Sequence, residues 1–133
     1  MIRIALVALL VLLPLTADAF TCNAAGCTFS AKYTEPTTNI AGGPVNLTGT
    51  TVYYKVNGGA EKAVQVPASG VNGGLAISQN IAETILPGQK AVITGQVTAK
   101  NAAGESARTT LVTLTIDRSG EVAPNPPVAG SFE

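Results

Sequence analysis

The two cysteines, Cys22 and Cys27, are the side chains of this 133-residue sequence whose type and spacing best support covalent chemistry. Asparagine, two alanines and a glycine separate them, and the chain has no histidine and no further cysteine. A zinc site would need more thiolate or imidazole ligands, and haem attachment would need two intervening residues followed by histidine. In an exported chain, two such cysteines form a disulfide by default. We therefore expect a Cys22–Cys27 disulfide that pins the chain locally, with no metal and no cofactor.

Side chains that could perform acid–base or nucleophilic catalysis are scattered along the sequence. Without histidine, the chain lacks the commonest general base and cannot form a Ser-His-Asp or Cys-His arrangement. Serines and lysines are present, but no motif joins them into a dyad. The carboxylates after residue 19 fall in different expected turns and strands, so they suggest no glycosidase-type pair. They are Glu35, Glu61, Glu83, Glu105, Asp117, Glu121 and Glu133. We expect a protein with no catalytic residues that is not an enzyme.

Tyr53 and Lys55 are the candidate binding residues. Alternation along this segment puts Tyr53 on the opposite face from Val52 and Tyr54, so we expect it to be exposed beside Lys55. A tyrosine next to a lysine is useful for contacting proteins or carbohydrates. The alternative is that Tyr53 packs across its own sheet. The net charge of zero and the 5% aromatic content give no support for nucleic-acid binding.

The first residues have the layout of a secretory signal peptide. Arg3 precedes an apolar run over residues 4–15, and Ala17 and Ala19 fit the small-residue rule for cleavage before Phe20. The run is shorter than the roughly 20 residues that cross a bilayer, so we expect cleavage rather than a retained membrane anchor. Lipid attachment at Cys27 is a further alternative, but this cysteine lies far beyond the apolar run. The sequence predicts a signal peptide over residues 1–19 and a secreted, extracellular or periplasmic protein.

Between residues 20 and 119 the hydrophobic pattern is that of strands. Apolar residues recur at every second position, and glycine, proline or asparagine marks a turn about every ten residues. The expected inward residues include Cys27, Phe29, Ala31, Tyr33, Val52, Tyr54, Val64, Val66, Leu75, Ile77, Ile81, Ile93, Val97, Ala99, Val112, Leu114 and Ile116. We expect one all-β domain, a sandwich of about six or seven antiparallel strands.

The last residues change in character. Three prolines, Pro124, Pro126 and Pro127, fall close together, with Gly120 and Gly130 on either side. Proline cannot donate a hydrogen bond to a strand ladder, and such composition favours an extended chain. We expect residues 120–133 to form a flexible tail.

The order of these segments resembles a fibronectin type III domain over residues 27–117. The sequence AKYTEP at residues 31–36 is similar to the family's second strand, where Tyr33 takes the place of the usual core tryptophan. Val52, Tyr53 and Tyr54 resemble the third strand, Leu86-Pro87-Gly88 the turn before the sixth strand, and residues 97–106 the end of that strand and its following loop. The resemblance, to the secreted bacterial type, implies an immunoglobulin-like sandwich that serves interaction rather than catalysis.

Three departures from the family affect the functional interpretation. Ile93 stands where the family has a tyrosine, Gly95 where it has an inward valine, and too few residues precede Cys27 for a normal first strand. Two hypotheses follow. The chain is a monomeric module for protein or carbohydrate interaction, in adhesion or as an accessory, or residues 122–132 fill the first-strand position, either in their own domain or in a neighbour. In the second case, strand addition to a neighbour makes the protein a structural subunit that self-assembles through its tail. A linker stub is the alternative for this tail, because its prolines disfavour a ladder strand.

Overall fold

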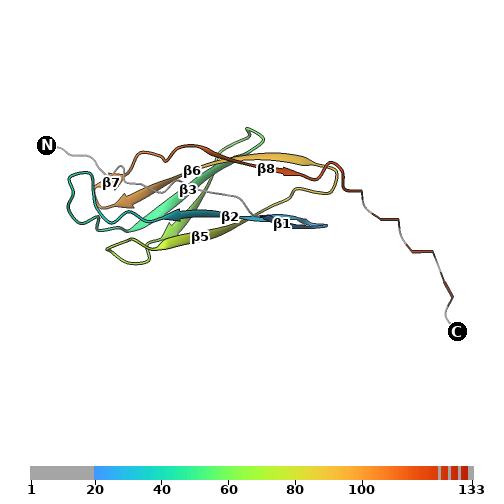
Figure 1. Cartoon of the computed structure of the whole chain (residues 1–133), viewed down its shortest axis with the longest axis horizontal. Helices are drawn as coiled ribbons and strands as arrows, with labels where there is room; N and C mark the ends of the chain where they lie inside the picture. Colours follow the sequence, from blue (N-terminus) through green and yellow to red (C-terminus); the bar gives the residue numbers. More distant parts are fainter. Residues whose placement is uncertain (1–19, 123, 126, 129, 132–133) are drawn as a thin grey trace.

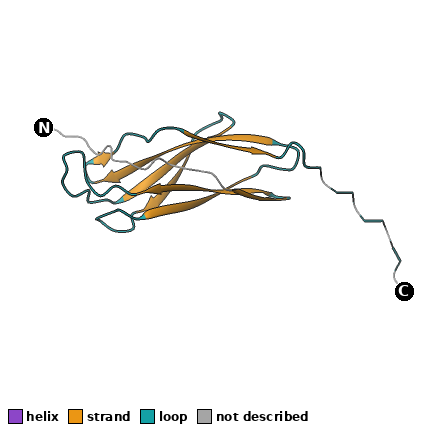
Figure 2. Cartoon of the chain, in the orientation of Figure 1, coloured by secondary structure: helices purple, strands orange, loops and turns teal. Residues whose placement is uncertain are grey.

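The computed structural model describes residues 20–122, 124–125, 127–128 and 130–131. These residues contain eight strands and no helix (Figures 1 and 2). The strands are β1 Phe20–Asn23, β2 Gly26–Thr34, β3 Gly49–Val56, β4 Lys62–Pro67, β5 Ala76–Glu83, β6 Lys90–Asn101, β7 Gly104–Glu105 and β8 Val112–Asp117. The expected all-β class is confirmed. The expected signal peptide lies outside the described residues.

The strands form two antiparallel sheets that pack face to face (Figure 1). One sheet has the order β1-β2-β5, and the other has five strands in the order β4-β3-β6-β7, with β8 also pairing with β6. The long β6 pairs with β3 along one side. Its other side pairs with β8 at its beginning and with the two-residue β7 at its end. Consecutive strands such as β2 and β3, or β5 and β6, lie in different sheets, so the chain crosses between the two layers of a sandwich.

The core confirms the alternation in most segments. In β2, Cys27, Phe29, Ala31 and Tyr33 are buried, and the residues between them are exposed or half-buried. The Phe29 and Tyr54 rings meet edge to face, with centroids 6.2 Å apart. Gly95 lies opposite Tyr54 in the β3–β6 register, so the position with the small residue faces the large ring. Tyr33 is buried as expected and shares a 2.6 Å hydrogen bond with the Thr50 hydroxyl.

The expectation that the first strand is missing is wrong. Residues Phe20–Asn23 form β1, which pairs with the start of β2 from Phe20 opposite Phe29 to Asn23 opposite Gly26. The Asn23 side chain closes the tight turn by accepting the amides of Ala25 and Gly26 at 2.8 and 3.2 Å. A Cβ at position 26 would lie 2.4 Å from the Glu83 carbonyl oxygen, so only glycine fits there. Because the turn between β1 and β2 is this short, the few residues before Cys27 are enough to form a paired first strand.

The expected Cys22–Cys27 disulfide is present, and it joins the two strands of this hairpin directly across the ladder. It holds β1 against β2, which agrees with the local role expected for it.

The expectation for Leu75 is also wrong. Its side chain is 56% exposed, and β5 begins one residue later. The cause is Glu35, whose buried carboxylate accepts the amides of Ser69 and Leu75 at 2.9 and 3.2 Å and a hydrogen bond from the Ser69 hydroxyl. This carboxylate satisfies the amides of the β4–β5 loop, while the Leu75 carbonyl accepts the backbone amide of Glu35 at 3.0 Å.

Candidate functional site

The outer face of the β4-β3-β6 sheet carries the candidate binding residues. Tyr53 lies opposite Ala63 of β4 and Gln96 of β6, and Lys55 lies opposite Thr94 of β6. Because side chains alternate along a strand, both candidates share this outer face. Lys55 is exposed and Tyr53 is half-buried, so the structure brings the two residues to one surface as expected.

Tyr53 is covered by an arginine from outside its own strand. The guanidinium carbon of Arg108 lies 3.9 Å from the centre of the Tyr53 ring, which is a cation–π contact. Arg108 lies between β7 and β8, and both of its terminal nitrogens bind Glu61, at 2.6 and 2.9 Å. This two-point ion pair lowers the pKa of Glu61 and raises that of Arg108. The guanidinium is therefore held in one orientation over the ring.

The hydroxyl end of Tyr53 is also fixed. It donates to Glu105 at 2.5 Å, and the Thr98 hydroxyl donates to the same carboxylate oxygen at 2.5 Å. The bonds from Thr98 and Tyr53 lower the pKa of Glu105, and the bond to Glu105 raises the pKa of Tyr53. We call these five residues, Tyr53, Glu61, Thr98, Glu105 and Arg108, the Tyr53 cluster.

Among the described residues, Lys55 forms no hydrogen bond or ion pair with this cluster; its charge acts on Glu61 through space and lowers the pKa of that carboxyl. The residue that covers the Tyr53 ring, Arg108, lies in the connection between β7 and β8 and not in a strand of the sheet. The sequence reasoning missed Arg108 and Glu61, which lie 47 residues apart. No local motif joins them to Tyr53, and only the strand register could have done so.

The Tyr53 cluster suits recognition by contact. It presents hydrogen-bonding groups and a balanced ion pair, and the side chains of Arg108 and Glu61 remain 39% and 34% exposed. A partner could therefore reach the pair without first unfolding any strand. Within the part of the chain that the structure describes, no group of three or more histidine, cysteine, aspartate or glutamate side chains could hold a metal ion. The same residues include no helix long and apolar enough to cross a membrane.

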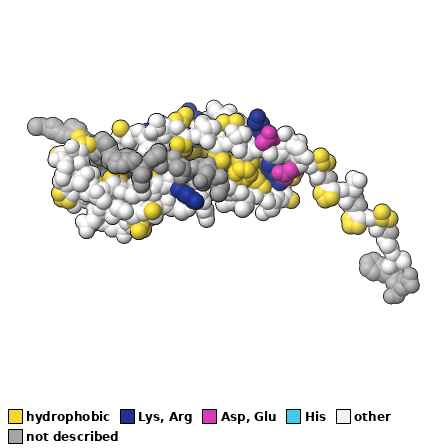
Figure 3. Space-filling view, in the orientation of Figure 1, with side chains coloured by type: hydrophobic (Ala, Val, Ile, Leu, Met, Phe, Trp, Pro, Cys, Tyr) yellow, Lys and Arg dark blue, Asp and Glu magenta, His cyan; other side chains and the backbone are white. Residues whose placement is uncertain are grey.

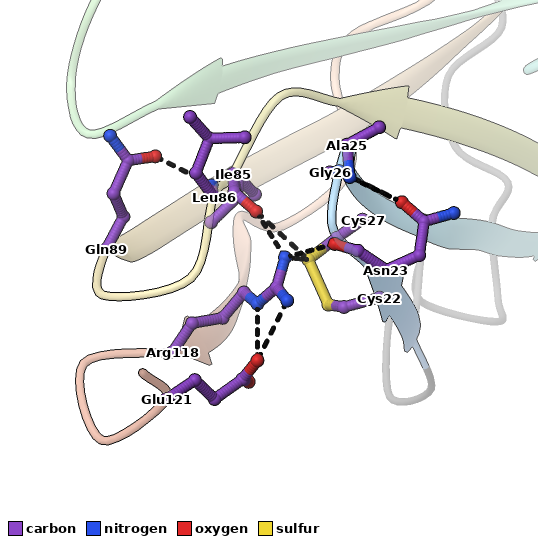
Figure 4. The surroundings of a disulfide bond; sticks show 10 residues. All are labelled: Cys22, Asn23, Ala25, Gly26, Cys27, Ile85, Leu86, Gln89, Arg118 and Glu121. Carbon is purple, nitrogen blue, oxygen red and sulfur yellow. Dashed lines mark hydrogen bonds and ion pairs between the residues drawn. A yellow bond between two sulfur atoms is a disulfide. The ribbon is translucent and has the colours of Figure 1, made fainter. Parts of the chain in front are cut away.

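A second polar cluster lies at the end of the domain where the tail leaves. Arg118 is 4% exposed, and one terminal nitrogen donates to the carbonyl oxygens of Asn23 and Ile85 at 2.8 and 2.7 Å (Figure 4). Its Nε and other terminal nitrogen bind Glu121 at 3.1 and 2.8 Å. The side chain thereby ties the end of β8 to the β1–β2 turn beside the disulfide and to the β5–β6 connection. This arginine is a structural clamp that fixes where the tail begins.

No protein-family model matches the chain, and no curated protein matches it in sequence. The architecture itself, two packed antiparallel sheets, is compatible with an immunoglobulin-like sandwich.

Proposed function

We propose that this protein is an exported, non-enzymatic fibronectin type III-like module that binds a protein partner through the outer face of its β4-β3-β6 sheet. The observation that carries the proposal is the Tyr53 cluster, in which Arg108 is stacked on Tyr53 and held there by Glu61. Tyrosine and arginine are the residue types most enriched at the energetic centres of protein interfaces.

The geometry favours a protein over a carbohydrate. Sugars commonly bind by laying a ring against an exposed aromatic face, but Arg108 already lies 3.9 Å from the Tyr53 ring centre. A protein partner needs no free ring face, because it can bind the ion pair and the exposed edge of the cluster. The hydrogen bonds to Glu61 and Glu105 restrict the Arg108 and Tyr53 side chains beforehand, so less conformational entropy is lost on binding.

The strand order supports the fibronectin type III assignment. The segments that resemble the family's second, third and sixth strands are β2, β3 and β6, in that order along the chain. They lie in the sheets β1-β2-β5 and β4-β3-β6-β8, so the third and sixth strands pair while the second lies in the opposite sheet. The disulfide supports export to an oxidising compartment, either the periplasm or the extracellular space.

The test is selection of ligands by the exported protein. A displayed random-peptide library and a glycan array are each probed with the wild type and with Arg108→Gln and Tyr53→Ala. Lys90→Gln is the matched control, because Lys90 is an exposed lysine on another part of β6. We expect selected peptides to lose at least about tenfold in affinity with the two cluster variants and to keep it with the control. Peptides that bind all four proteins equally would show that the Tyr53 cluster is not the binding site. Binding to glycans but to no peptide would show that the partner is not a protein.

A further inference from the structure

One side of β2 is only partly paired. Strand β5 pairs with β2 from Cys27 to Thr34, but β1 on the other side reaches only from Gly26 to Phe29. Among the described residues, none pairs with residues 30–34 on that side. Successive residues of a strand direct their N–H and C=O groups to opposite sides, so about half of these groups face the open side. Such an edge is a template for a further strand.

The tail contains a segment suited to this edge. After Pro127, residues 128–133 read VAGSFE and contain no proline, so every residue has an amide to donate. The prolines that disfavour pairing are confined to residues 124–127. In the described part of the tail, Val122 and Val128 are 87% and 95% exposed, and apolar side chains lie along it clear of the domain (Figure 3).

The side chains of the two segments are complementary in one register. If the tail continues β1 upstream of Phe20 and runs antiparallel to β2, Phe132 lies opposite Ala31 and Gly130 opposite Tyr33. Ala31 and Tyr33 are both buried on the inner face of β2. The large Phe132 side chain would therefore lie beside the small Ala31, and Gly130 would leave room for the large Tyr33 ring. Ser131 then lies opposite Lys32 and Glu133 opposite Ser30, on the outer face. Cross-strand pairs of this kind are what stabilises a sheet.

The tail of the same molecule does not reach this position. It leaves the domain at Glu121, beside Asn23 and the beginning of β2, and points away from the sheets (Figure 1). An antiparallel strand must enter from the far end, next to Thr34. From Glu121 to Ala129 a proline-rich chain spans about 25 Å at 3.1 Å per residue. The nine residues of β2 alone are about 27 Å long, before the chain reverses.

We propose that residues 128–133 of one copy pair with residues 30–34 of β2 in a second copy, completing the strand that β1 begins. The contact joins different surfaces of the two copies, so it builds head-to-tail chains, or closed assemblies where two or more copies exchange their tails. This inference rests on the proposed export, because removal of residues 1–19 makes Phe20 the first residue of β1. It is independent of the Tyr53 cluster, which lies on the outer face of the other sheet.

The first test is the association of the processed protein. The full chain is exported by a bacterial host, its N-terminus is identified by mass spectrometry, and its mass is followed by sedimentation velocity over a wide concentration range. We expect oligomers that grow with concentration. Phe132→Ser should weaken association at least about tenfold, whereas Val122→Ser, an exposed valine outside the pairing segment, should not.

The second test locates the contact by cross-linking. Lys32→Cys in one preparation is mixed with Ser131→Cys in another, and disulfides are identified by mass spectrometry. The control mixes Ser131→Cys with Ser78→Cys, because Ser78 is the exposed partner of Lys32 on β5 and marks the other edge of the same sheet. We expect the first mixture to form heterodimers much faster than the control.

Each outcome separates the two proposals. A retained leader in the mass spectrum would reject the cleavage before Phe20 on which the tail inference depends. A protein that begins at Phe20 and stays monomeric at every concentration would overturn the tail inference alone, as would cross-linking that favours Ser78. Loss of peptide binding in the Tyr53 cluster variants would leave the tail inference untouched.

Discussion

Replacing Arg118 with methionine should destabilise the domain strongly. Methionine has a comparable length and no donor, so Arg118→Met leaves the Asn23 and Ile85 carbonyl oxygens without the guanidinium that binds both at 2.8 and 2.7 Å. An unsatisfied buried acceptor costs about 1–3 kcal/mol. The contact with Ile85 is buried, whereas the contact with Asn23 is partly buried and open to replacement by water, so the variant should lose about 1–3 kcal/mol of stability. This is a large fraction of the roughly 5–15 kcal/mol that stabilises a typical domain.

Urea unfolding measures this loss as a lower midpoint with an unchanged slope. Glu121→Gln is the matched control, since it removes the charge that pairs with Arg118 but leaves both backbone contacts intact. The Glu121 side chain is 51% exposed, so this variant should lose clearly less stability than Arg118→Met. Equal losses in the two variants, or no loss in Arg118→Met, would refute the reasoning that backbone satisfaction makes Arg118 a clamp.

Three further predictions concern the hairpin, the Tyr53 cluster and the β4–β5 loop. Replacing both Cys22 and Cys27 with serine should cost about 2 kcal/mol, measured by urea unfolding, since so short a loop removes little unfolded-state entropy. The pKa of Glu105 is lowered in the folded state. The stability that its carboxylate contributes is therefore fully present above the ordinary pKa of 4.5 and is lost as the pH falls through the folded-state pKa. The stability of the wild type relative to Glu105→Gln should therefore decrease on acidification, and a constant difference from pH 7 to 3 would contradict this. Glu35→Gln should cost about 1–3 kcal/mol and speed hydrogen exchange of the Leu75 amide, because the carboxylate that accepts it is buried; unchanged exchange would argue against this role.

The strands with strict alternation could be predicted from the sequence. In β2, and in β6 as far as Val97, the buried residues follow a period of two, and this period depends only on the neighbouring residues. The turn at Asn57 and Gly58 was predictable for a similar reason, since both residues have the positive φ angles that a tight hairpin demands.

Features that depend on contacts distant in sequence could not be predicted. Strand β1 is a different case, because its contacts are local: it is only four residues long, too short for an alternating pattern to be recognised, and the Asn23 turn and the disulfide hold it against β2. Leu75 has the spacing of a strand residue, but the buried Glu35 determines its backbone bonding. Arg108 reaches Tyr53 because β6 pairs with β3 and because Glu61 holds the guanidinium.

The most direct test of the proposed function is a chemical-shift map of the ¹⁵N-labelled exported protein, recorded with a peptide selected by the wild type. We expect the amide shifts to concentrate at Tyr53, Gln96 and Thr98, which lie together across β3 and β6. Shifts that concentrate at the opposite sheet, or a failure to select any peptide, would contradict a recognition surface on the β4-β3-β6 face.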